Sequence, residues 1–73
     1  MFAMRYKMIG LKIAYYRKMR GYTQGQLAGK IGISLGQIER GNNGKSYSLE
    51  TLLSIAVGLD IDVNLLLSSS ENI

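Results

Sequence analysis

Glycine stops and hydroxyl caps divide this chain into segments that are long enough only for short helices. In the first segment, about residues 7–20, the apolar side chains recur three or four positions apart, which is the spacing of one helix face. Gly21 follows this segment as a helix end. Thr23 and Gln26 then form a Thr-x-x-Gln capping box that begins a second helix, and Gly32 ends that helix.

Three further capping residues continue the pattern. We expect Ser34 to cap a third helix, Ser48 to cap a fourth with the sequence SLETLLSIAVGL, and Asp62 to cap a short fifth over residues 63–67. No segment has strand signals, and the chain has no proline.

These segments predict an all-α fold, a compact five-helix bundle that contains a helix-turn-helix between its second and third helices. The chain of 73 residues makes one domain. Its core is expected over about residues 7–67, with a flexible N-terminal arm over 1–6 and a flexible tail over 68–73.

Composition excludes several classes of function. The chain has no cysteine and no histidine, which removes thiolate metal sites, disulfides and the commonest general base. Its five acidic residues form no spaced pair on one element, so we expect no enzyme, no cofactor, no metal and no small-molecule site. No apolar run is long enough for a membrane span or a signal peptide, and the expected location is cytoplasmic.

Charge is divided unevenly along the chain. All nine Lys and Arg residues lie within residues 1–45, together with one acid, whereas residues 46–73 carry the other four acids and no cation. A bias of this kind predicts that the first part of the chain faces a polyanion.

In their order along the chain, these motifs resemble the Cro/repressor-type helix-turn-helix family, also called lambda-repressor-like or xenobiotic-response-element domains. The matching segments lie within residues 9–67 and are IGLKIAYYRKMRGYTQGQLAGKIGIS, IERG, SLETLLSIA and LDIDVNLLL. The resemblance implies a small homodimeric, sequence-specific transcription regulator, such as a repressor, on a palindromic operator in double-stranded DNA. It also implies that the third helix lies in the major groove.

The third helix fits the family in two ways, because this chain has only three residues between the Ser of GIS and the IE pair. A gapped alignment deletes about one helical turn and pairs IERG with its family counterpart. An ungapped alignment pairs NNGK with the family's common ENGK, and places Gly41 where a large apolar residue belongs, at a cost of about 2–5 kcal/mol. The gapped alignment also supplies Glu39 as an ion-pair partner for Arg17, where the ungapped one supplies Asn42. These two arguments favour the gapped alignment.

In the gapped alignment the third helix runs from about residue 34 to 40, and Leu35 and Ile38 share its apolar face. Gln37 is the one residue at its start that can make a bidentate contact, which would be to adenine. The expected base-reading residues are Ser34, Gly36 and Gln37.

The expected phosphate contacts lie at the start of the second helix and around the glycine turn after the third. They are Gln24, Arg40, Asn42, Asn43 and Lys45. The resemblance implies these contacts for Gln24, for Lys45 and for the backbone amides around Asn42 and Asn43, whereas Arg40 either reaches a phosphate or is a solvated cation.

The C-terminal segment is unusually apolar for a surface helix. We expect a dimer interface at Ile61, Leu65 and Leu66, with local core packing as the alternative. A rival function follows from the shortened third helix: a helix-turn-helix-shaped module that binds a protein, such as an antitoxin or another partner-binding protein, with weak or lost base reading.

Overall fold

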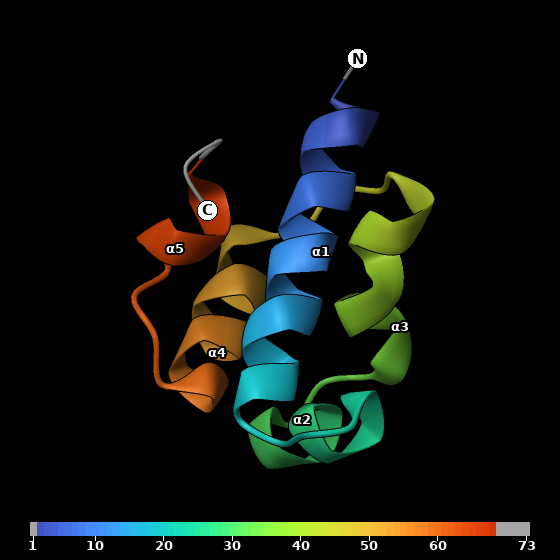
Figure 1. Ribbon diagram of the computed structural model, residues 1–73. Coiled ribbons are helices and arrows are strands. Elements are labelled where there is room, and N and C mark those ends of the chain that lie inside the picture. Colours follow the sequence, from blue (N-terminus) through green and yellow to red (C-terminus); the bar gives the residue numbers. More distant parts are fainter. Residues whose placement is uncertain (1, 69–73) are drawn as a thin grey trace.

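The computed structural model describes residues 2–68, and it is helical throughout its regular structure (Figure 1). No strand occurs within those residues, and five α-helices are present, so the predicted all-α five-helix fold is confirmed. The elements are α1 (Ala3–Met19), α2 (Gln24–Ile31), α3 (Leu35–Glu39), the 3-10 helix η1 (Arg40–Asn43), α4 (Leu49–Leu59) and α5 (Asn64–Leu67).

Helix α1 begins earlier than the sequence indicates, at Ala3 instead of about residue 7. The expected arm over residues 1–6 is therefore wrong for residues 3–6, which form the first turn of the helix. The Tyr6 amide donates to the Phe2 carbonyl at 3.0 Å, and the loop at Gly44 packs against Ala3. This start has no side-chain cap and no acidic residue in its first turn, so the sequence carries no signal for it.

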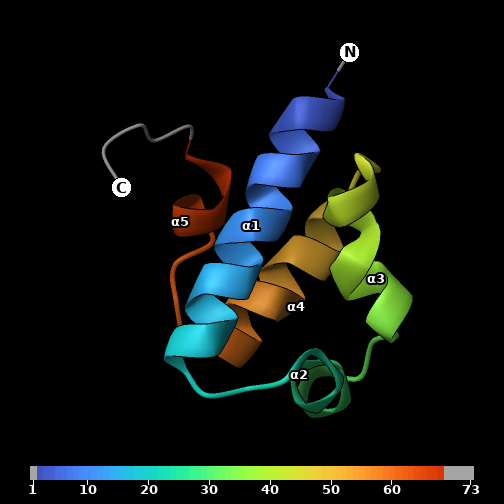
Figure 2. The same cartoon turned by 45° about the vertical axis from the view of Figure 1, so that its right-hand side comes forward.

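The core lies where α1, α2, α4 and α5 meet, and Figure 2 shows α1 running between α5 and α3. Four helices contribute side chains that are less than 2% exposed, and each such side chain stabilises the fold by about 1.5–3 kcal/mol. These side chains are Ile13, Leu27, Ile55, Leu59 and Leu66.

The predicted caps fix the ends of the short helices. The Thr23 hydroxyl accepts from the Gln26 amide at 3.0 Å, and the Gln26 side chain accepts from the Thr23 amide at 2.8 Å. Gly32 ends α2 in the left-handed conformation with φ 74°. Asp62 Oδ1 accepts from the Asn64 amide at 2.8 Å, but the N-cap position of α5 is Val63, one residue later than predicted.

Helix α1 approaches η1 closely because Gly41 has no side chain. A Cβ at Gly41 would lie 2.4 Å from the Tyr6 carbonyl oxygen and 2.5 Å from the Tyr47 hydroxyl. That hydroxyl accepts from the Gly41 amide at 2.8 Å and donates to the Ile38 carbonyl at 2.9 Å. Burial raises the pKa of the Tyr47 phenol, against smaller lowering effects of the Gly41 amide and the Arg40 charge. The phenol therefore remains a donor at neutral pH.

Within residues 2–68, no helix combines the length and the apolar character needed to cross a lipid bilayer.

We expect Gly41→Ala to lower the free energy of unfolding by about 1–3 kcal/mol, because the added methyl group collides with backbone that cannot move aside cheaply. Gly29→Ala is the matched control: a Cβ at this exposed helical position meets nothing within 4 Å. It should raise stability by about 0.5–1 kcal/mol through helix propensity. Urea denaturation of the two variants measures both effects, and equal changes would contradict the close approach of α1 and η1.

Candidate nucleic-acid interface

Helices α2 and α3 are joined by a tight turn, with Gly32 at its start and Ser34 at its end. Ser34 is the N-cap of α3, as predicted, and its hydroxyl accepts from the Gln37 amide at 3.2 Å. In Figure 2, α2 is seen nearly end-on below α3, so the two helices lie across one another. This is the helix-turn-helix arrangement that presents the start of the second helix of the pair to a groove.

The side chain of Gln37 has a role that the sequence reasoning missed. Its Oε1 accepts from the Ser34 amide at 2.9 Å, so Ser34 and Gln37 form a second capping box. A bidentate contact with adenine requires both the oxygen and the nitrogen of the amide. Gln37 therefore has to leave the cap before it can make the expected contact. The Ser-x-x-Gln spacing repeats that of Thr23 and Gln26, and would have revealed the cap.

The outer surface of α3 differs from the expected one at Leu35. This side chain is 45% exposed, although the gapped alignment placed it on the apolar face with Ile38, which is 3% exposed. A helical side chain covers the turn before its own position, and the first residue of α3 has no core beneath that turn. Leu35 thus lies on the exposed surface with Ser34, Gly36 and Gln37.

The helical path continues past α3 before it turns. Helix α3 ends at Glu39, η1 follows over Arg40–Asn43, and Gly44 then adopts φ 72°, as its place in the predicted turn requires. The Gly44 amide donates to the Gly41 carbonyl at 2.9 Å, and the Lys45 amide donates to the Arg40 carbonyl at 3.0 Å. These two amides are occupied within the protein, whereas the side chains of Asn42, Asn43 and Lys45 are exposed.

Arg40 borders a groove of 350 Å³ beside the start of α4. Its Nε donates to the Ser46 carbonyl at 2.6 Å, which holds the exposed guanidinium over the loop between η1 and α4. The sequence reasoning did not identify the polar residues that share this groove with Gln37 and Arg40. They are Ser46, Tyr47, Ser48 and Thr51.

Arg17 has a different partner from the expected Glu39. Its Nη1 donates to the Tyr22 carbonyl at 2.5 Å, which fixes the turn between α1 and α2, and its buried Nε has no hydrogen-bond partner among residues 2–68. Glu39 is half-buried at the end of α3. The expected ion pair between Arg17 and Glu39 therefore no longer favours the gapped alignment over the ungapped one.

Two other cations, Arg20 and Lys30, are exposed but direct hydrogen bonds to the end of α4. Arg20 donates to the Leu59 carbonyl at 2.8 Å and to the Asp60 carbonyl at 3.1 Å, and Lys30 donates to the Gly58 carbonyl at 3.0 Å. Cations at a helix C-terminus satisfy its free carbonyls and interact favourably with its dipole. Part of the basic charge is thus structural.

The expected dimer interface needs a correction at Leu66, which is completely buried in the core of a single chain. This side chain packs inward because α5 closes the end of the bundle. Leu65 on the same helix is 41% exposed, whereas Ile61 is half-buried against the core. Leu65 is therefore the residue of the expected three that remains open to contact by a partner.

No group of three potential metal ligands is present in the described part of the chain.

Comparison with known proteins decides the family to which this arrangement belongs. A sequence model described as Helix-turn-helix matches residues 13–66, most of the chain. The chain belongs to the Cro/repressor-type helix-turn-helix family. No solved structure matches it significantly.

Two curated relatives are similar over 67 residues. The HTH-type transcriptional regulator SinR of Bacillus licheniformis is 37% identical, and the HTH-type transcriptional regulator SinR of Bacillus subtilis (strain 168) is 40% identical. Each alignment covers 88% of this chain and 60% of the relative. The chain thus spans less than two thirds of the length of these relatives.

A double-mutant cycle tests the partner of Arg17. The geometry predicts that Arg17→Met destabilises the fold, since it frees the Tyr22 carbonyl, and that Glu39→Gln adds its own small effect independently. Unfolding free energies of both single variants and the double variant give the coupling. A coupling above about 0.5 kcal/mol would restore the ion pair of the gapped alignment.

Proposed function

We propose that this chain is a sequence-specific DNA-binding transcription regulator that acts as a small homodimer on a palindromic operator. The observation that supports this function most strongly is the exposed start of α3, held across α2 by the tight turn at Gly32. Membership of the helix-turn-helix family and the similarity to two HTH-type transcriptional regulators point the same way.

In the proposed complex α3 lies in the major groove. Ser34, Gly36 and Gln37 face the bases, and exposed Leu35 joins them as an apolar side chain that can contact a thymine methyl group. A Cβ at Gly36 would meet only the Ser34 hydroxyl, at 3.9 Å, so the surface of α3 is open at this position. The backbone of α3 can therefore approach the floor of the groove closely.

Phosphate contacts in this proposal come from both sides of α3. Gln24 is the first residue of α2, where the free amides of the helix attract an anion. On the other side lie the exposed side chains of Arg40, Asn42, Asn43 and Lys45.

The proposed homodimer uses α5, whose Leu65 is exposed beside the half-buried Ile61. A palindromic site requires a two-fold axis at this helix that turns both copies of α3 to the same side of the dimer.

The glutamines of the two capping boxes provide a matched pair of variants. Gln37→Ala and Gln26→Ala each remove the side-chain half of a capping box, so each should cost about 0.5–1 kcal/mol of stability. Only Gln37 lies at the start of α3. We expect Gln37→Ala alone to change the preferred operator, with a loss of about 1–3 kcal/mol of discrimination at one base pair.

Selection of operators from a random duplex pool, followed by affinity measurements on single-base variants, compares the two glutamine variants with the parent protein. An unchanged base preference in Gln37→Ala would contradict the assigned reading role.

Titration of salt tests the phosphate contacts. Affinity for duplex DNA should fall as salt rises, and Lys45→Ala should reduce the slope of log K against log salt by about one. Asp60→Asn changes a charge at the opposite end of α4 from the groove that Arg40 borders, and should leave that slope unaltered. Gel-shift assays across a salt series measure these slopes. Absence of DNA affinity even at low salt would favour the rival function of a protein-interaction module.

A further inference from the structure

Helix α1 is apolar on two opposite faces, and only one of them is used by the fold. Gly10 and Ile13 are buried on the inner face. The outer face carries large apolar side chains that remain open to solvent, with Met8 half-buried among them. The exposed fractions are 69% for Met4, 68% for Leu11, 52% for Tyr15 and 65% for Met19.

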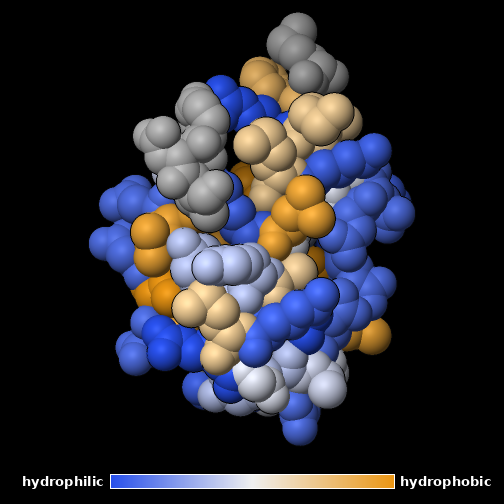
Figure 3. All heavy atoms as spheres, in the orientation of Figure 1, coloured by the Kyte–Doolittle hydropathy of each residue, from blue (hydrophilic) through white to orange (hydrophobic). Residues whose placement is uncertain are grey.

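These five residues form one continuous surface, here called the α1 stripe. Their spacing along the helix is four, three, four and four positions, which keeps them on one face over about 22 Å of helix. Figure 3 shows tan and orange side chains in the upper part of the face turned to the viewer and a tan one farther down, with a pale-blue side chain between them. Contiguous apolar surface of this kind marks interaction sites on small soluble domains.

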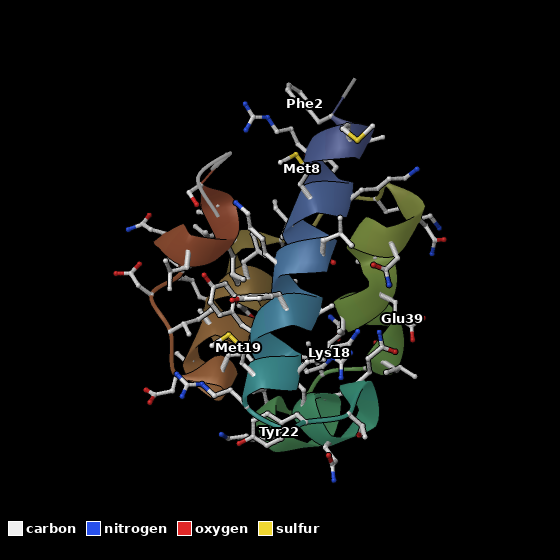
Figure 4. The ribbon with its side chains drawn as sticks, in the orientation of Figure 1. Phe2, Met8, Lys18, Met19, Tyr22 and Glu39 are labelled. Carbon is white, nitrogen blue, oxygen red and sulfur yellow. The ribbon has the colours of Figure 1, made fainter. Side chains whose placement is uncertain are left out.

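Positive charge borders the α1 stripe on both sides. At 100° per residue, Lys7 and Lys18 fall on one flank of the stripe, and Arg5 and Lys12 fall on the other. Figure 4 shows Lys18 and Met19 at the same end of α1. The sequence of α1 contains no acidic residue, so no charge of the helix itself offsets these four cations.

We propose that the α1 stripe is a docking surface for an acidic amphipathic helix of a partner protein. The apolar side of that helix would cover the stripe, and acidic residues on its two edges would meet the four flanking cations. Three of the five stripe residues are methionines, whose flexible side chains adapt to the shape of a partner. A second copy of α1 fits poorly, because it would bring two sets of cations together.

This surface is separate from the proposed DNA interface. None of its residues belongs to α2, α3 or the loop after η1. The inference therefore does not depend on DNA binding, although the flanking Lys7 lies against Gly44, next to the proposed phosphate contact Lys45.

Designed peptides provide the probes. The acidic peptide is a fluorescein-labelled helix of three heptads with leucine at positions a and d and glutamate at e and g. A second peptide has lysine in place of each glutamate, and a third has the acidic composition in shuffled order. We expect fluorescence anisotropy to show saturable binding of the acidic peptide alone, because only it combines the apolar seam with complementary charge.

Variants of the intact chain locate the site. Leu11→Glu should weaken binding of the acidic peptide at least tenfold, and Tyr15→Ser should weaken it without adding charge. The control is Val57→Glu, which changes a 78% exposed residue of α4 and should leave binding unchanged. Circular dichroism verifies that each variant is folded. If Leu11→Glu is unfolded, the affinity of Tyr15→Ser for the acidic peptide tests the site in its place.

Several results would overturn the proposal. Equal binding of the lysine peptide, or equal weakening by Val57→Glu, would show that the interaction is unspecific. Self-association that Leu11→Glu abolishes would assign the stripe to a second copy of the chain. Binding to vesicles of phosphatidylglycerol without binding to the acidic peptide would assign it to a membrane surface.

Discussion

The hydroxyl group of Tyr47 holds together the part of the structure on which the α3 surface depends. It bridges the Ile38 carbonyl and the Gly41 amide from a buried position, where each unpaired backbone group would cost about 1–3 kcal/mol. Helix α3 is only five residues long and could not be stable by its own hydrogen bonds. Its continuation into η1, fastened by Tyr47 and pressed against α1 at Gly41, gives this short helix a fixed direction.

The same bridge explains how the chain accommodates Gly41. A glycine in place of a core leucine would leave a cavity, and that objection counted against the ungapped alignment. In the structure the space around Gly41 is filled by the ring of Tyr47 and the backbone of α1. Gly41 therefore leaves no cavity that would destabilise the fold. The cavity argument against the ungapped alignment no longer applies, and it does not decide the register of α3 relative to other family members.

Local signals in the sequence were sufficient for most helix boundaries. Thr23, Ser34 and Ser48 are N-caps where their spacing predicts, and Asp62 accepts from the Asn64 amide beside the start of α5, because such bonds join residues two or three positions apart. Contacts between distant segments were beyond such reasoning. The early start of α1 depends on the loop at Gly44, and the burial of Leu66 depends on how α5 closes the bundle.

For the candidate site, the sequence predicted which residues are exposed more successfully than it predicted their hydrogen-bond partners. Ser34, Gly36 and Gln37 do lie exposed at the start of α3, but the hydrogen bonds of Arg17 and Gln37 are directed to backbone groups. Sequence spacing shows which residues share a helix face. It cannot show which of several nearby acceptors a long flexible side chain will choose, since that depends on the packing of the surrounding turns.

The capping role of Gln37 gives the proposed DNA reader a choice between two states. In one, the amide oxygen stays on Ser34 and α3 keeps its cap. In the other, the amide turns to a base and the first turn of α3 loses a bond of about 1 kcal/mol. A poorly matched base pair does not offset that loss, so the protein would scan such DNA with the cap closed. The two forms of the complex would then differ at the first turn of α3. Its cap would be closed while the protein searches the DNA and open when the protein is bound to its site.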